Sequence, residues 1–228
     1  MLSRTAASLY WLGRYLERAD FVARLVEATV RLDVLSSRPA GEAAWRSALA
    51  VTDSETAFEA SGAPLTREAV VAFLSTDTSH PGSIVRCLHA ARDNARAVRT
   101  ALSREAWSAI NGAWLIFDRR VTPLDSTATL GLVDKVKAET RGFEGAVHRM
   151  LRNQTTLFIR LGQVIERADN TARILDVHLQ LLLEDPWIDE DTACRSLMGV
   201  MGTFPPADAG EVTRSDVLTS LAVDRTNP

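Results

Sequence analysis

The segment LYWLGRYLERADFVAR, residues 9–24, decides the fold class of this chain. Its apolar residues recur three and four positions apart, and the same spacing continues beyond the segment. This is the period of one face of an α-helix, so we predict a helix from about Thr5 to Leu35. Its apolar face consists of Leu9, Leu12, Leu16, Ala19, Ala23, Val26 and Val30.

Helical periodicity also dominates the rest of the 228 residues, whereas alternating β-branched runs bounded by hairpin turns are missing. The predicted fold class is therefore all-α. Prolines, glycines and N-capping side chains such as those of Thr66 and Ser103 mark the helix boundaries. The later helices are predicted at about Glu42–Ala60, Thr66–Leu74, Ser83–Leu102, Ser103–Arg120, Thr127–Leu151, Gln154–Glu184, Asp189–Met201 and Ser215–Val223.

The composition is that of a globular protein without a strongly charged partner. Hydrophobic residues make up 46% of the chain, enough for a core, and the formal net charge is only -3. Such a charge gives no global attraction to nucleic acid or to an acidic membrane, so we predict binding to neither. Charged residues interrupt the first apolar run, and this interruption distinguishes the N-terminal segment from a signal sequence. No apolar run is long enough to span a bilayer. The predicted location is the cytoplasm.

Residues that usually hold metals or cofactors do not occur at the required spacings. Cys87 and Cys194 lie far apart, which gives neither a disulfide framework nor a metal-ligand pair. None of the four histidines follows a glutamate in the Glu-x-x-His arrangement of carboxylate-bridged metal sites. Gly-rich phosphate loops and nucleophile elbows are also missing. We therefore predict no metal and no cofactor, and we name no catalytic residue.

An internal repeat relates the first predicted helix to the one that begins at Gln154, with a constant offset of 149 residues. We interpret the chain as a single domain over residues 1–228, a helical bundle made from a duplicated helical unit with pseudo-twofold symmetry. Residues 1–148 form the first unit, and residues 149–228 form an incomplete second unit. Apolar surface left open by that incompleteness would favour a homodimer. The repeated pairs are Leu12-Gly13 and Leu161-Gly162, Glu17-Arg18-Ala19-Asp20 and Glu166-Arg167-Ala168-Asp169, and Ala23-Arg24 and Ala172-Arg173.

The repeated motif places acidic and basic side chains beside the apolar face of each helix. Glu17, Asp20 and Arg24 lie on one stripe, and small residues such as Gly13 and Gly162 would let the two motif helices approach closely. One interpretation is a buried ion-pair network that orients the helices. Another is a polar pocket that binds an amino acid or a peptide through its charged groups. The candidate substrate-binding residues are Glu17, Arg18, Asp20, Arg24, Glu166, Arg167, Asp169 and Arg173.

Several segments resemble the bacterial alpha-E family, a predicted helical domain named for its Glu-Arg motif. The resemblance implies that Glu17, Arg18, Glu166 and Arg167 are signature positions. It also implies an association with circularly permuted ATP-grasp ligases, transglutaminase-like proteases and proteasome-like hydrolases. Family members are usually longer than this chain. The segments that carry the resemblance are Met1–Ala6, Leu9–Tyr15, Glu17–Asp20, Ala23-Arg24, Pro81–Ile84, Ala91–Arg96 and Glu166–Asp169.

From this resemblance we expect a helical accessory or scaffold partner of an ATP-grasp-type peptide or amide ligase. Such a partner would present an amino-acid or peptide substrate between the motif helices and would have no activity alone. Two alternatives stay open. The chain is an enzyme in its own right that uses Glu17 and Glu166 as acid/base groups, or it is a purely structural interaction module.

Overall fold

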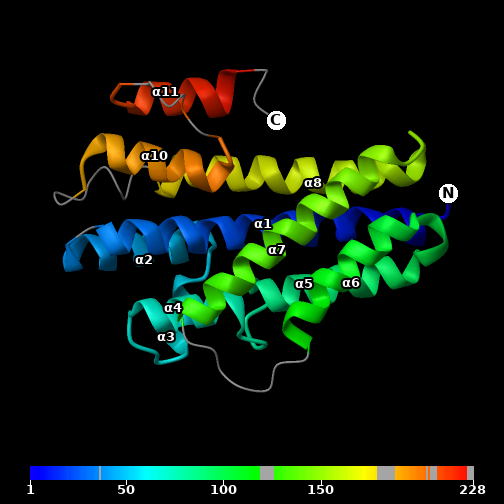
Figure 1. The fold of residues 1–228 in the computed structure, drawn as a ribbon, viewed down its shortest axis with the longest axis horizontal. Coiled ribbons are helices and arrows are strands. Elements are labelled where there is room, and N and C mark those ends of the chain that lie inside the picture. The colour runs from blue at the N-terminus through cyan, green and yellow to red at the C-terminus, as the bar shows by residue number, and fades with distance from the viewer. Residues whose placement is uncertain (36, 119–125, 179–187, 204, 206–209, 225–228) are drawn as a thin grey trace. The chain divides into compact units, whose positions relative to one another are not determined.

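The computed structural model of the protein describes residues 1–35, 37–118, 126–178, 188–203, 205 and 210–224. In these residues the secondary-structure elements are helices, with no strand. Figure 1 shows these helices in chain order. The predicted all-α class is therefore confirmed. The elements are α1 (Ser3–Leu35), α2 (Arg38–Val51), α3 (Glu55–Ala60), α4 (Arg67–Ser75), α5 (Ile84–Ala97), η1 (Arg99–Ala101), α6 (Arg104–Asp118), α7 (Ser126–Arg149), α8 (Gln154–Arg173), η2 (Ile174–His178), α10 (Glu190–Met201), α11 (Arg214–Leu218) and η3 (Thr219–Val223).

The chain folds into two compact units that differ from the predicted sequence units. Unit 1 contains Met1–Ala23 and Val71–Ala168, and unit 2 contains Arg24–Val70 and Asp169–Pro228. A compact cluster in space and a repeated stretch of sequence are different divisions of a chain. The predicted boundaries at residues 148 and 149 therefore stay a prediction.

Unit 1 is built around the first part of α1, the helices α5 to α7 and most of α8. Helix α6 packs against both α5 and α7. The predicted apolar face of α1 is buried here, since Leu9, Leu12 and Ala19 are completely covered. On α5, Leu88 and Ala91 are buried in the same way. This core fixes the backbone of α1 that carries the first Glu-Arg pair.

Unit 2 collects the second part of α1 with shorter helices. Helix α2 packs against η2 and α3, and α10 packs against α11. η2 continues α8 as one wider π-helical turn. The remainder of the predicted helix Gln154–Glu184, from residue 179 on, lies outside the described residues, as do residues 119 and 120 of the predicted helix Ser103–Arg120. The small apolar cluster of unit 2 consists of Leu32, Ala40, Ala44, Ile188 and Ala193.

The single helix predicted over Glu42–Ala60 is wrong, because the structure contains two helices there. Asp53, with a positive φ of 54°, breaks the backbone path between α2 and α3. The hydroxyls of Thr52 and Ser54 donate to the carbonyl oxygens of Ala48 and Leu49, at 2.9 and 3.3 Å. These bonds give hydrogen-bond donors to carbonyl oxygens at the end of α2, which the N–H groups of a further helical turn would otherwise supply.

The predicted N-caps are confirmed. The Thr66 hydroxyl accepts from the backbone N–H of Ala69 at 3.3 Å, and the Ser103 hydroxyl accepts from that of Ala106 at 3.1 Å. Helices α4 and α6 begin at the residues that follow these caps. None of the helices in the described ranges is long and apolar enough to cross a membrane.

Candidate functional site

Both motif glutamates are buried in unit 1. The exposed fraction is 5% for Glu17 on α1 and 1% for Glu166 on α8. A carboxylate taken out of water is costly unless a cation and hydrogen bonds compensate it. The site is therefore defined by what surrounds these two side chains.

Each glutamate is paired with the arginine of the opposite motif. Arg18 donates from Nε and Nη2 to the two carboxylate oxygens of Glu166, at 2.6 and 3.1 Å. Arg167 donates from the same two nitrogens to Glu17, at 2.9 and 3.1 Å. Such two-point pairing fixes both distance and orientation. The two Glu-Arg dipeptides thus form crossed ion pairs between α1 and α8.

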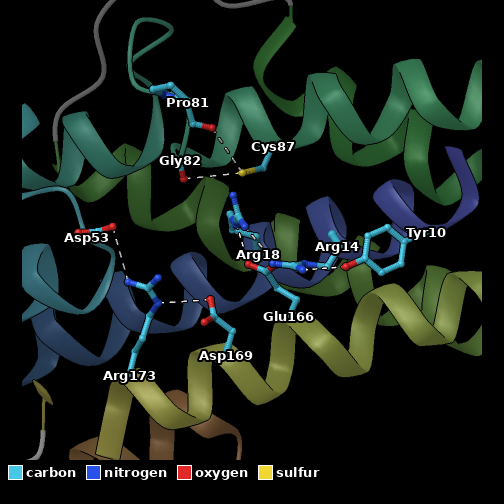
Figure 2. A network of polar contacts seen from close by, with 10 residues as sticks. All are labelled: Tyr10, Arg14, Arg18, Asp53, Pro81, Gly82, Cys87, Glu166, Asp169 and Arg173. Carbon is cyan, nitrogen blue, oxygen red and sulfur yellow. Dashed lines mark hydrogen bonds and ion pairs between the residues drawn. The ribbon is translucent and has the colours of Figure 1, made fainter. Parts of the chain in front are cut away.

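Glu166 also binds a second guanidinium, which sequence reasoning missed. Arg14 donates from Nε to Glu166 and from Nη1 to the Tyr10 hydroxyl, the latter at 2.9 Å (Figure 2). Arg14 lies outside the motif, but it stands four residues before Arg18 and so shares its helix face. That spacing is the signal that would have found it. At the position 149 residues later, the chain has the uncharged Gln163.

The motif helices touch through their glycines. A Cβ placed on Gly13 would collide with the carbonyl oxygen of Ile159, and one on Gly162 would collide with that of Tyr10. Side chains there would force the helices apart. Within unit 1, α1 and α8 run in the same direction (Figure 1). The close approach brings the crossed side chains within reach of each other.

The network holds its arginines charged. Burial lowers the pKa of Arg18, but hydrogen bonding to Glu166 and the charge of Glu166 outweigh it, so the pKa lies above its ordinary value. For Arg167, the hydrogen bond to Glu17 is the largest influence and raises the pKa. Cys87 of α5 lies next to Arg18 in Figure 2, yet complete burial raises the pKa of its thiol to about 12. This thiol is therefore a core group and not a nucleophile.

A small pocket opens beside one of the two crossed pairs. Its volume is about 30 Å³, enough for water-sized groups, whereas sites for small molecules are usually ten or more times larger. In its wall, Asp20 accepts a hydrogen bond from the Thr140 hydroxyl at 2.6 Å. Glu144 lies 3.7 Å from Arg167. The pocket is lined by Leu16, Glu17, Asp20, Thr140, Arg141, Glu144, Gln163 and Arg167.

The remaining candidates belong to unit 2 and have partners there. Arg24 donates to the carbonyl oxygen of Val200 at 2.7 Å. Arg173 pairs with Asp169 at 3.3 Å and lies 3.9 Å from Asp53 (Figure 2). The eight predicted residues therefore divide, with five in unit 1 and three in unit 2. Among the described residues, no group of three or more His, Cys, Asp or Glu side chains could hold a metal ion.

Fold and site together define an all-helical protein whose two Glu-Arg dipeptides are joined crosswise in a buried network. The chain belongs to the Alpha-E family, described as a predicted alpha-helical domain with a conserved ER motif, and the family model matches residues 1–228. Comparison with curated proteins and with solved structures found no match. Glu17-Arg18 and Glu166-Arg167 are the two ER dipeptides of this chain.

Proposed function

We propose that the protein is a helical scaffold that acts as an accessory partner of an ATP-grasp-type peptide or amide ligase. The crossed pairing is the observation that carries the scaffold role. Both oxygens of Glu17 and both oxygens of Glu166 accept from guanidinium groups, so the motif binds the protein's own helices together. The ligase association rests on the resemblance to the family.

A duplicated helical unit is part of the same proposal. The residues that meet between α1 and α8 are related by the offset of 149, as in the reciprocal contacts of Gly13 and Gly162. Thr66 and Thr213 are 147 residues apart, two fewer than the offset of the motif helices, and both cap a helix, with Thr213 accepting from the N–H of Asp216 at 3.4 Å. These correspondences support a common origin for the two halves.

Presentation of an acceptor substrate is the third part. An amino acid or a peptide would place its ammonium group in the pocket beside Glu17. The charged lining of this pocket is Glu17, Asp20 and Glu144 against Arg141 and Arg167, and is therefore acidic by one side chain. The volume of about 30 Å³ admits that group alone and leaves the rest of the acceptor outside. Glu144→Gln should then weaken acceptor binding without loss of stability, because the Glu144 side chain is 59% exposed. Calorimetric titration with the ligase's acceptor measures this, and unchanged affinity would remove this part.

The scaffold role is tested with an ATP-grasp ligase, the class of partner that the family resemblance implies. We expect the two chains to co-purify in fixed ratio, ligase turnover to rise in the complex, and the isolated protein to show no turnover. The competing enzyme hypothesis gives a different result. Turnover by the isolated chain that Glu17→Gln abolishes, while the circular dichroism spectrum stays unchanged, would replace the scaffold by an enzyme.

A further inference from the structure

Two arginine–tryptophan stacks join α5 and the short η1 to α6 in unit 1. The guanidinium carbon of Arg92 lies 3.9 Å from the centre of the Trp114 ring, and that of Arg99 lies 4.9 Å from the centre of the Trp107 ring. The two arginines are seven residues apart, and their tryptophans are seven apart in the reverse order, so the segments run antiparallel. Helices α5 and α6 lie side by side (Figure 1). We call Arg92, Arg99, Trp107 and Trp114 the Arg-Trp ladder.

The guanidinium group of Arg92 is held in one orientation. Its Nε donates to the side-chain oxygen of Asn111 at 2.9 Å. Trp114 in turn makes an edge contact with His89, with ring centroids 6.0 Å apart. In the described part of the chain, neither the Nη atoms of Arg92 nor the guanidinium of Arg99 has a hydrogen-bond acceptor. A planar fork that is already fixed on an indole ring loses little entropy when it binds an anion.

The surface around the ladder is basic. Over Ile84–Asp118, five arginines stand against three acidic residues, although the whole chain has a net charge of -3. Arg96 is exposed, lies one helical turn after Arg92, and has no ion pair among the described residues. Asp93 lies about a quarter-turn from Arg92 at 100° per residue, and Glu105 lies on the opposite side of α6 from the ladder. Basic side chains therefore dominate this face.

We propose that the Arg-Trp ladder, together with Arg96, binds an acidic helical segment of a partner protein. Arg92, Arg96 and Arg99 follow a spacing of four and three, which is also the spacing of side chains along one face of a helix. Arg99 lies in η1, and its stack on Trp107 keeps it on the same face as Arg92. Carboxylates at positions i, i+4 and i+7 of a partner helix therefore match the three guanidinium groups.

The chemistry of the ladder suits this partner. Guanidinium groups bind carboxylates through two parallel hydrogen bonds, which fix orientation as well as distance. Arginine and tryptophan are also the residue types that contribute most to binding at protein interfaces. The surface contains none of the residues of the crossed ion pairs, and the proposal holds whether or not the partner is a ligase.

Binding of a synthetic peptide to the whole chain tests the proposal. The probe is a fluorescent, alanine-rich helical peptide with glutamates at i, i+4 and i+7, and its control has the same composition with glutamates at i, i+2 and i+5. Fluorescence anisotropy should show saturable binding of the first peptide and at least about tenfold weaker binding of the second. Equal binding of the two peptides, or no binding of the first, overturns the proposal.

Substitution of two exposed arginines locates the binding surface. Arg96→Gln with Arg99→Gln should weaken binding of the matched peptide by at least about tenfold, while the circular dichroism spectrum stays unchanged. Arg86→Gln with Arg149→Gln is the control, because it removes the same charge from exposed sites of unit 1 outside the ladder. At about 0.1 M salt, which screens charges beyond about 10 Å, the control should stay within about twofold of wild type. Equal losses in both double variants would show general charge attraction and would overturn the proposal.

Arg92→Lys separates the fork from its charge and covers the case in which the double variant fails to fold. Lysine keeps the charge but cannot supply a planar fork on Trp114, so affinity for the matched peptide should fall severalfold. Unchanged affinity would overturn recognition by the ladder. Two other occupants give different results, and either one overturns the proposal. Single-stranded RNA that displaces the peptide at equal concentration would show a general polyanion site. A dimer in light scattering that Arg96→Gln with Arg99→Gln abolishes would assign the face to a second copy of the chain.

Discussion

Arg18 and Glu166 are joined by two hydrogen bonds, Nε to Oε1 at 2.6 Å and Nη2 to Oε2 at 3.1 Å. The pair between Arg167 and Glu17 uses the same atoms in the opposite direction along the chain. Adjacent Glu and Arg residues point about 100° apart on a helix. Each motif can therefore accept with one side chain and donate with the next, which explains why the two residue types occur side by side.

Glu166→Gln should destabilise the protein by about 3 kcal/mol, because it leaves the partly buried Arg14 and Arg18 without their anion. Glu17→Gln should cost less, since Arg167 keeps Glu144 at 3.7 Å. Urea unfolding at neutral pH measures both free energies. Glu59→Gln, at an exposed site, is the control and should stay within about 0.5 kcal/mol of wild type. Equal small effects at all three sites would contradict a buried network.

The glycine contacts predict opposite effects for the same substitution at different sites. Gly13→Ala and Gly162→Ala should each destabilise by about 1–3 kcal/mol, because the new methyl group meets a backbone carbonyl that cannot move freely. Gly145→Ala on α7 has open space around it and should stabilise by up to about 1 kcal/mol through helix propensity. Thermal unfolding of the three variants checks the sign. Stabilisation at Gly13 would show that the helices are not in contact there.

Because His80 is buried, we predict that the free energy of unfolding falls in weak acid. Its ring stacks on Phe73 with centroids 4.3 Å apart, and neither ring nitrogen has a hydrogen-bond partner in the described part of the chain. Burial lowers the pKa of His80, and the nearby charge of Asp77 only partly opposes this. The unfolded chain then takes up a proton near pH 6.5, before the folded protein does, so stability falls as the pH drops below that value.

The control for this titration is His80→Phe, which keeps a ring against Phe73 and removes the titrating group. Urea midpoints measured across the weakly acidic range should fall for the wild type and change less for the variant. Burial raises the pKa of Asp77, but hydrogen bonds from Ser79 and from the backbone of His80 outweigh it and hold the pKa below its ordinary value, so Asp77 titrates below the weakly acidic range. Identical pH profiles for the two proteins would show that His80 is not the responsible group.

The sequence predicted the helices and the interior position of the motif because both depend on periodicity. Apolar spacing identifies the buried face of α1, and the stripe that contains Glu17 was predicted beside that face. Periodicity does not identify partners. The expected stripe of Glu17, Asp20 and Arg24 is split between the two compact units, and Glu17 pairs with Arg167 instead.

The break at Asp53 was missed for a local reason. Asp53, a non-glycine residue with positive φ, lies between α2 and α3. Aspartate adopts this conformation more readily than most residues, so the residue type alone does not predict a break. The apolar pattern on either side still reads as helical. Arg14 escaped notice because it stands outside the repeated motif, and its role depends on Glu166, which lies 152 residues away.

The two cysteines offer separate reporters of the two units. Burial raises the pKa of Cys87 in unit 1 to about 12 and that of Cys194 in unit 2 to about 11. At pH 8 neither thiol should react with an aromatic disulfide reagent in the folded protein, and both should react in denaturant. Glu166→Gln weakens unit 1, so it should accelerate labelling of Cys87 more than that of Cys194. Mass spectrometry of labelled peptides distinguishes the two sites. Rapid labelling of Cys87 in the wild type, or equal acceleration of both thiols in the variant, would contradict a buried network confined to unit 1.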